Sequence, residues 1–253
     1  MKSKGVKTFL LFLISSILLY IYDMDETNKI AGGSYALEEQ FPFMAVVHRL
    51  LDNGGISQCG GSIISKRWVL TAGHCITQFP RRVLVVFGTI DKKGIRYDYT
   101  TGPGISMITS QVKVIVKIII SVGKIQPIRL AGYNEIRESF ADMSAYVIGW
   151  GKDMQTGPGV KLLKYAVLPV IYNSECSRYW NVNEKNICTA TDFTQNACQG
   201  DSGGPLVVYR NKKPLQVGIV SYGDGYCPSE RPGVFTRVSA FAQWIETITG
   251  IRL

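Results

Sequence analysis

Short apolar runs separated by turn-forming residues constrain the fold of this chain more than any other feature of its sequence. After residue 30, runs rich in β-branched residues alternate with Gly, Pro, Asn and Asp. The clearest runs cover residues 43–47, 83–87, 145–148, 167–171 and 215–220. Runs of this length between turn formers are typical of strands in a sandwich or barrel. We therefore predict an all-β fold.

One helix is predicted near the C-terminus, over about residues 238–249. Val238, Phe241, Ile245 and Ile248 are spaced by 3, 4 and 3 residues, which places them on one helical face, and Gly250 is positioned to end the helix.

The N-terminus has the pattern of a secretion signal. Three lysines in the first seven residues precede an apolar stretch over residues 8–22. The stretch is shorter than the roughly 20 apolar residues that a membrane-spanning helix needs. We predict a signal peptide over residues 1–22, a polar propeptide over 23–29, and a secreted, extracellular protein that no membrane holds after signal cleavage.

Composition narrows the class of protein further. The six cysteines are an even number in a chain destined for an oxidising compartment, which favours three disulfides. A metal site is disfavoured, because there is no Cys-x-x-Cys pair and there are only two histidines. The net charge is +9, which can favour acidic partners, but no run of five basic residues suggests nucleic-acid binding. We expect neither a cofactor nor a nucleic-acid partner.

Two short stretches carry candidate catalytic residues. His74 lies in LTAGHC (70–75) and Ser202 lies in NACQGDSGGP (196–205). Acyl transfer needs a nucleophile, a base and fixed donors for the oxyanion. Ser202 could be the nucleophile and His74 the base, with the backbone N–H groups of Gly200 and Ser202 as donors. A lone histidine or a serine among glycines is usually structural, but the two together, each beside a cysteine, favour catalysis.

These stretches, with several further motifs, resemble the chymotrypsin/trypsin family of secreted serine proteases, with insect-like or collagenase-like branches nearest. The further motifs are CGGSI (59–63), WVL (68–70), QPI (126–128), GWG (149–151), SYG (221–223) and RPGV (231–234). The resemblance implies a peptidase domain over residues 30–250, built from two Greek-key β-barrels of the trypsin-like fold and a C-terminal helix. The first barrel is expected over about 30–129 and the second over about 145–236.

The resemblance also implies covalent links and an activation step. The expected disulfides are Cys59–Cys75, Cys176–Cys188 and Cys198–Cys227. Cleavage between Lys29 and Ile30 resembles the activation cleavage of the family, after which the Ile30 ammonium would pair with Asp201 and assemble the turn beside Ser202. The implied partners are protein or peptide substrates and an activating protease, and the protein is expected to be a monomer.

The family's specificity pocket can be placed on this sequence in the same way. Asn196 stands at the pocket floor, where a trypsin carries Asp, and Gly223 and Gly233 stand where the walls must be open. A Lys or Arg side chain would find no countercharge there, which favours large apolar or aromatic side chains. Asp224, among turn residues, is expected to be solvated. Activation after Lys29 would then need a separate trypsin-like protease.

The chain departs from the family at the third catalytic residue, an Asp that heads an apolar strand between the His and the Gln-Pro-Ile motif. Between His74 and Gln126 the only carboxylates are Asp91 and Asp98, and both match the region upstream of that strand. The apolar run over residues 112–120 contains only lysines as charges. We therefore expect the first barrel to lack a strand together with the acid.

Two consequences of this departure stay open. Either Asp91 or Asp98 is recruited by an altered loop, or catalysis is severely impaired, and we favour impairment. The leading function is a serine endopeptidase of impaired activity. The alternatives are a non-catalytic protease homologue that binds or regulates partners, and an alternative or faulty transcript product with its junction near residues 121–122.

Overall fold

The computed structural model describes residues 32–50, 55–76, 82–95, 102, 104–109, 125–154, 156–191 and 194–253. The predicted signal peptide and propeptide, the activation residues Lys29 and Ile30, Asp98, and the interval 110–124 that should lack a strand lie outside the described residues. These expectations therefore stay predictions, as do the limits of the two barrels.

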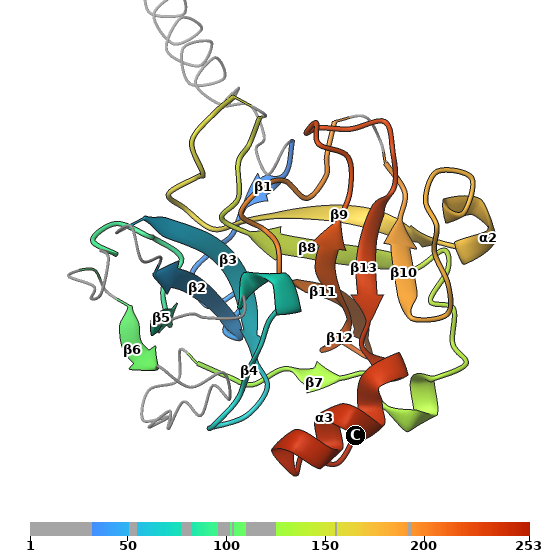
Figure 1. The fold of residues 1–253 in the computed structure, drawn as a ribbon, viewed down its shortest axis with the longest axis horizontal. Helices are drawn as coiled ribbons and strands as arrows, with labels where there is room; N and C mark the ends of the chain where they lie inside the picture. Colours follow the sequence, from blue (N-terminus) through green and yellow to red (C-terminus); the bar gives the residue numbers. More distant parts are fainter. Residues whose placement is uncertain are drawn as a thin grey trace, which may run out of the picture.

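The described residues form two sheets with few helices (Figure 1). The strands are β1 (Ser34–Tyr35), β2 (Met44–Leu50), β3 (Ile56–Ile63), β4 (Val69–Leu70), β5 (Arg82–Phe87), β6 (Ile105–Thr109), β7 (Arg129–Leu130), β8 (Ser144–Gly149), β9 (Lys164–Ile171), β10 (Asn186–Thr189), β11 (Pro205–Arg210), β12 (Lys213–Tyr222) and β13 (Gly233–Arg237). The helices are η1 (Gly73–Cys75), η2 (Tyr133–Glu135), α2 (Asn173–Cys176), η3 (Ser239–Phe241) and α3 (Ala242–Thr249), where η marks a 3-10 helix.

Apart from β1, the strands of the two sheets follow one another along the chain. The first has the strand order β4-β3-β2-β5-β6 and the second the order β1-β9-β10-β13-β12-β11-β8, with β7 beside β12. Because β8 also pairs with β9, the second sheet closes into a barrel. The five apolar runs lie in β2, β5, β8, β9 and β12, except that residue 43 directly precedes β2, which confirms the predicted all-β class, and the closed second sheet is one of the two expected barrels.

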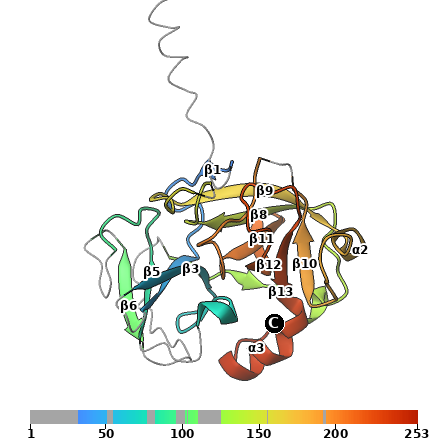
Figure 2. The same cartoon turned by 45° about the horizontal axis from the view of Figure 1, so that its top comes forward.

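The N-terminal strand crosses from one sheet to the other. β1 pairs with β9 of the second sheet, and the chain then enters β2 of the first (Figure 2). The ring of Phe41, which lies between β1 and β2, packs against that of Tyr165 in β9 at 5.3 Å between centroids. This crossing segment helps to hold the two sheets together.

A buried hydrogen bond also joins the sheets. Ser62 Oγ in β3 donates to Gln216 Oε1 in β12 at 2.7 Å, and both residues are fully buried. The Gln216 amide nitrogen donates in turn to the carbonyl of Gly218. Buried polar groups of this kind are stable only when they are paired.

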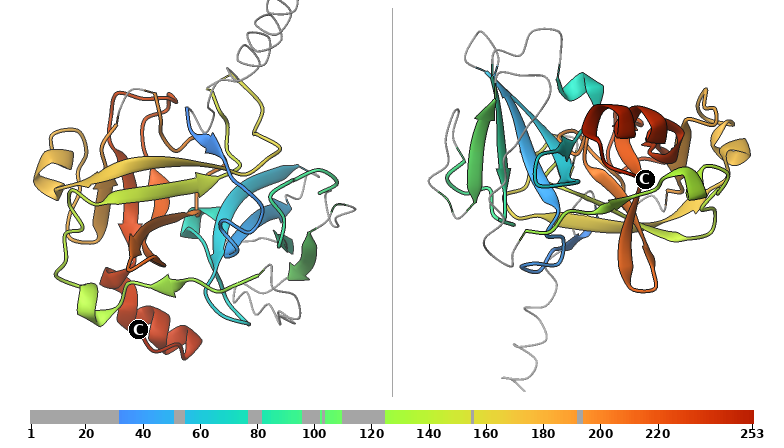
Figure 3. Two further views of the ribbon diagram at one scale, coloured as in Figure 1. Left: turned by 180° about the vertical axis from the view of Figure 1, so that it is seen from behind. Right: turned by 90° about the horizontal axis from the view of Figure 1, so that it is seen from below.

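The predicted C-terminal helix is confirmed as η3 followed by α3 (Figure 3). Ile245 is 2% exposed and belongs to the same apolar core as residues of the first sheet. Gly250 adopts a left-handed φ of 72° and its N–H donates to the carbonyl of Glu246, which ends the helix. No helix within the described ranges is long and apolar enough to cross a bilayer.

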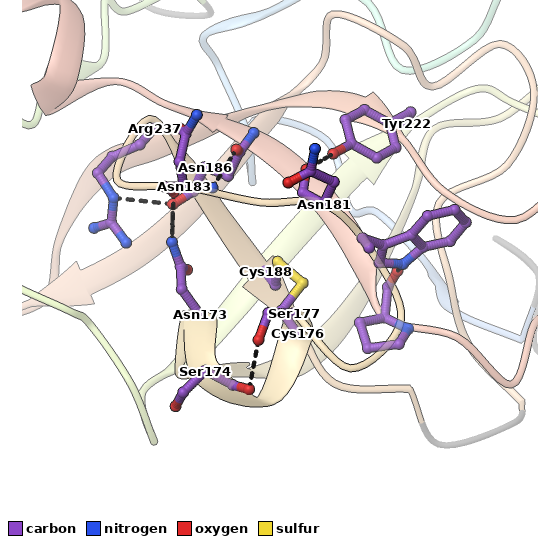
Figure 4. Close-up of a disulfide and its surroundings, with 12 residues drawn as sticks. Asn173, Ser174, Cys176, Ser177, Asn181, Asn183, Asn186, Cys188, Tyr222 and Arg237 are labelled. Atoms are coloured by element: carbon purple, nitrogen blue, oxygen red, sulfur yellow. Dashed lines mark hydrogen bonds between the residues drawn. A yellow bond between two sulfur atoms is a disulfide. The ribbon is translucent and has the colours of Figure 1, made fainter.

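Three disulfides are present, in the pairs that the resemblance implies: Cys59–Cys75, Cys176–Cys188 and Cys198–Cys227. The second of them joins α2 to β10 (Figure 4). Beside it, Asn173 Nδ2 donates to the carbonyls of Asn183 and Asn186, so the segment between α2 and β10 is tied down by both covalent and polar contacts.

We predict that Ser62→Ala lowers the free energy of unfolding by about 1–3 kcal/mol, because it leaves the buried Gln216 oxygen without its donor. Urea unfolding followed by tryptophan fluorescence measures the change. The exposed Ser174→Ala variant is the matched control and should stay within about 0.5 kcal/mol of the parent. Equal unfolding midpoints for Ser62→Ala and the parent would contradict the structural role of this hydrogen bond.

Candidate active site

Ser202 lies in a glycine-rich turn that precedes β11. Gly200 and Gly203 adopt left-handed φ values of 99° and 81°. A Cβ on Gly203 would lie 2.1 Å from Thr71 Oγ1 and 2.7 Å from the carbonyl oxygen of Gly60. Only glycine combines this backbone conformation with so close an approach to the first sheet. The turn is therefore shaped by both sheets.

The backbone amides of this turn divide into bonded and available groups. The N–H groups of Asp201, Gly203 and Gly204 donate to backbone carbonyls within the turn and in β12. Among the described residues, no protein acceptor receives the N–H of Gly200 or of Ser202. Two unbonded amides on one turn are the donors that an oxyanion needs.

The carboxylate of Asp201 is buried beneath this turn. It accepts hydrogen bonds from Gly151 N at 2.7 Å and from Cys198 N at 2.9 Å. A Cβ on Gly149 would lie 2.1 Å from Asp201 Oδ1, so the carboxylate fills the space that this glycine leaves. Burial raises the pKa of Asp201 to about 6, although the two N–H groups and the nearby Lys92 act against the shift.

His74 reaches the same place from the first sheet. It lies in η1, next to Cys75, whose Sγ is 3.5 Å from the carbonyl oxygen of Ser202. That carbonyl also accepts a hydrogen bond of 2.8 Å from Gly60 N in β3. The histidine is exposed, and its ring nitrogen lies within 4.8 Å of the sulfur atoms of Cys59 and Cys75, whose disulfide leaves no thiolate for a metal.

The structure thus brings the His74 and Ser202 segments together, but it leaves two contacts unmade. Among the described residues, no hydrogen bond joins the imidazole to Ser202, and no carboxylate bonds to the imidazole. The Asp91 carboxylate instead accepts a hydrogen bond of 2.8 Å from the N–H of Lys93. The backbone of Asp91 forms an antiparallel β-bridge with Leu162. Asp91 therefore caps its own turn, and Asp98 lies outside the described residues.

A cavity of about 120 Å³ opens beside Ser202 and is lined by Asn196, Gly223 and Gly233, among other residues. Asn196 is 5% exposed. Its Oδ1 accepts from Ala197 N at 2.8 Å and its Nδ2 donates to the carbonyl of Arg231 at 3.3 Å. A Cβ on Gly223 would meet no atom within 4 Å, whereas one on Gly233 would lie 3.2 Å from Asn196 Oδ1.

The expectation that Asp224 is solvated was wrong. Its side chain is only 23% exposed, and it lines the same cavity as Asn196. Its carboxylate accepts from Ser229 Oγ at 3.2 Å and lies 3.7 Å from Arg231 Nε. The cavity therefore contains an acidic group after all, but Arg231 partly neutralises it. The ion pair joins residues seven apart in a loop, and the sequence carries no periodic pattern that would reveal it.

Two further residues, Lys92 and Gln58, contribute to the surroundings of the turn although the sequence does not mark them as candidates. Lys92 Nζ donates to Gln58 Oε1 at 2.6 Å and to the carbonyl of Trp150 at 3.3 Å. Gln58 Nε2 donates to the same carbonyl at 3.2 Å, and it is 3.3 Å from the position of a Cβ on Gly200. No local pattern marks either residue, since the contacts join segments far apart in the chain.

Comparisons with known proteins agree with this geometry. The family model described as Trypsin matches residues 30–245. Serine protease 1 and Serine protease 2 of Drosophila melanogaster are each 32% identical to this chain over 244 residues, covering 90% of it and 88% of their own length. A solved structure of HL collagenase is similar with a TM-score of 0.73 at 29% identity, over 87% of this chain and 99% of that one.

The pKa of Asp201 leads to a prediction about stability and pH. Because this pKa is raised from 3.8 to about 6 in the folded chain, that chain holds a proton between about pH 4 and 6 that the unfolded chain has released. The free energy of unfolding should therefore fall as the pH rises through this window, by about 3 kcal/mol. Urea unfolding of the uncleaved protein at several pH values measures this.

Asp201→Asn cannot ionise and should lose this part of the pH dependence, whereas the exposed Asp142→Asn should keep it. If the curves of the parent and of Asp201→Asn ran parallel from pH 4 to 7, Asp201 would not be the group responsible.

Proposed function

Because the chain belongs to the trypsin family, we propose that it is a secreted serine endopeptidase with Ser202 as the nucleophile and His74 as the general base. One observation carries this proposal. The turn that holds Ser202 presents the N–H groups of Gly200 and Ser202 without protein acceptors among the described residues, directly against the His74 segment.

In the proposed reaction, Ser202 Oγ attacks the carbonyl carbon of the scissile peptide bond while His74 takes the hydroxyl proton. The carbonyl oxygen becomes an oxyanion and accepts hydrogen bonds from Gly200 N and Ser202 N. His74 then gives its proton to the leaving amine, and the acyl group stays on Ser202 until water, activated by the same imidazole, releases it.

Activation is proposed to follow cleavage between Lys29 and Ile30 by a separate trypsin-like protease. The new ammonium at Ile30 would give the buried Asp201 carboxylate a cation, which offsets the cost of removing that charge from water. Because Asp201 adjoins Ser202, this pairing would stabilise the glycine-rich turn that holds Ser202 and the N–H groups of Gly200 and Ser202, which we call the oxyanion turn. The signal peptide over residues 1–22 and the propeptide over 23–29 belong to the same proposal.

The proposed substrates are proteins or peptides with a large apolar or aromatic residue before the scissile bond. The cavity floor carries the neutral amide of Asn196, and the carboxylate of Asp224 is already engaged by Arg231. An incoming Lys or Arg side chain would lose its hydration without gaining a free countercharge, which disfavours binding.

The rate is proposed to be low, because no carboxylate among the described residues bonds to His74. In a protease of this family, neutralising that acid lowers turnover by about 10⁴, since the imidazole is then neither held in its working tautomer nor stabilised when protonated. The same observation favours a second candidate, a non-catalytic homologue that binds or regulates partners through the retained cleft.

Labelling with a fluorophosphonate separates the two candidates. After cleavage at Lys29, we expect Ser202 to be labelled about 10⁴-fold more slowly than the nucleophile of a family member with an intact triad. Ser202→Ala should abolish labelling and the exposed Ser174→Ala should not. Absence of any labelling would favour the non-catalytic homologue, whereas rapid labelling that Asp98→Asn abolishes would identify the missing acid.

A substitution at the cavity floor tests the proposed specificity. Asn196→Asp places a carboxylate where a basic side chain would end, so kcat/KM for Lys or Arg peptides relative to Phe peptides should rise at least about 10-fold. The exposed Asn181→Asp is the matched control and should leave the ratio unchanged. An unchanged ratio in Asn196→Asp would place the specificity elsewhere.

A further inference from the structure

A second cavity, of about 380 Å³, lies where the two sheets meet and is lined by three lysines, Lys92, Lys93 and Lys161. Gln58 from β3 also lines it, and none of its described lining residues is Asp or Glu. This cavity shares no described lining residue with the Asn196 cavity. We call it the lysine cavity.

The backbone around the lysine cavity is tightly held. Lys92 N donates to the carbonyl of Lys161 at 2.9 Å, and Leu163 N donates to the carbonyl of Ile90 at 2.7 Å. Between them, Asp91 and Leu162 form an antiparallel bridge. Lys92 and Lys161 therefore project from two segments that are paired across the junction of the sheets, and not from independent surface loops.

Lys92 is the most constrained of the three lysines. Its ammonium donates to Gln58 Oε1 at 2.6 Å and to the carbonyl of Trp150 at 3.3 Å, which leaves one of its three N–H groups for a ligand. Burial lowers the pKa of Lys92 to about 8, although the distant charge of Asp201 raises it. Within the described part of the chain, none of the three lysines makes an ion pair.

The lysine cavity and the Asn196 cavity both adjoin the oxyanion turn, since Gln199 and Ser202 line the Asn196 cavity and Gln58 lines the lysine cavity. Gln58 lies next to this turn, since its Nε2 is 3.3 Å from the position that a Cβ on Gly200 would occupy. Two residues after Gln58, Gly60 N binds the carbonyl of Ser202. In the proposed binding mode, the side chain before the scissile bond occupies the Asn196 cavity and the scissile carbonyl lies at the oxyanion turn, so that the residues after the bond lie beside Gln58, towards the lysines.

We infer that the lysine cavity binds an acidic side chain, Glu or Asp, in the first residues after the scissile bond of the substrate. This inference rests on the proposed function and extends it to the leaving-group side of the peptide. A carboxylate there would meet the three ammonium groups in a partly enclosed site, where charges are screened less than at an open surface. A basic residue at the same position would be repelled.

Peptide hydrolysis by the Lys29-cleaved protein tests the inference. Peptides with Phe before the scissile bond carry Glu, Gln or Lys at the first, second or third position after it, and are otherwise identical. At one of these positions, we expect kcat/KM for Glu to exceed that for Gln at least about 10-fold, with Lys lowest, and the preference to shrink as salt is added. Equal kcat/KM for Glu and Gln at all three positions would overturn the inference and leave the proposed function standing.

Variants assign the effect to the cavity. Lys92→Gln should reduce the kcat/KM preference for Glu over Gln to less than about 3-fold. The exposed Lys161→Glu should raise kcat/KM for the Lys peptide relative to the Glu peptide. Lys185→Gln removes an exposed lysine outside the cavity and serves as the control for net charge. A preference that survives both cavity variants, or that Lys185→Gln weakens equally, would overturn the inference.

Binding without hydrolysis keeps the inference testable if the protein proves inactive. Rhodamine-labelled forms of the same peptides are titrated with the Ser202→Ala protein, and fluorescence anisotropy gives Kd. We expect the Glu peptide to bind at least about 10-fold more tightly than the Gln peptide, with Lys161→Glu removing the difference. Equal binding would overturn the inference. Tighter binding of the Glu peptide without fluorophosphonate labelling of the parent would support the inference while the catalytic proposal fails.

Discussion

The buried carboxylate of Asp201 is the contact on which the geometry of the site depends. It lies in a space that two glycines, Gly149 and Gly151, leave open, and it accepts the N–H groups of Gly151 and Cys198. A charge removed from water is stable only when donors or a cation surround it. The carboxylate therefore ties the turn of Ser202 to the segment that directly follows β8.

The site also depends on how the two sheets pack. The first sheet supplies His74, the Cys59–Cys75 disulfide and the N–H of Gly60, and the second supplies Ser202 with its turn. Thus the proposed nucleophile and its proposed base come from opposite sides of one interface, which the crossing segment after β1 and the bond between Ser62 and Gln216 stabilise. Both cavities adjoin this turn, since Ser202 lines one of them and Gln58, which lies next to Gly200, lines the other.

Much of this architecture could be predicted, because its signals are local. Short β-branched runs between turn formers identify strands, and the spacing from Val238 to Ile248 identifies the C-terminal helix. The glycines around Ser202 mark a turn that excludes a Cβ, and the cysteines indicated three disulfides. The Asp224–Arg231 ion pair and the Lys92–Gln58 hydrogen bond could not be predicted, since each depends on how loops or distant strands come together.

By itself, the sequence determined the all-β class, the C-terminal helix, the glycine turn and the residue types at positions 74, 196 and 202, because backbone sterics and hydrophobic periodicity act over a few neighbouring residues. Only the tertiary structure decided which charges lie together. It placed Asp224 in the Asn196 cavity, turned Asp91 towards its own turn, and gathered Lys92 and Lys161 at one junction. Electrostatic interactions depend on distance in space and on burial, and neither can be read from positions along the chain.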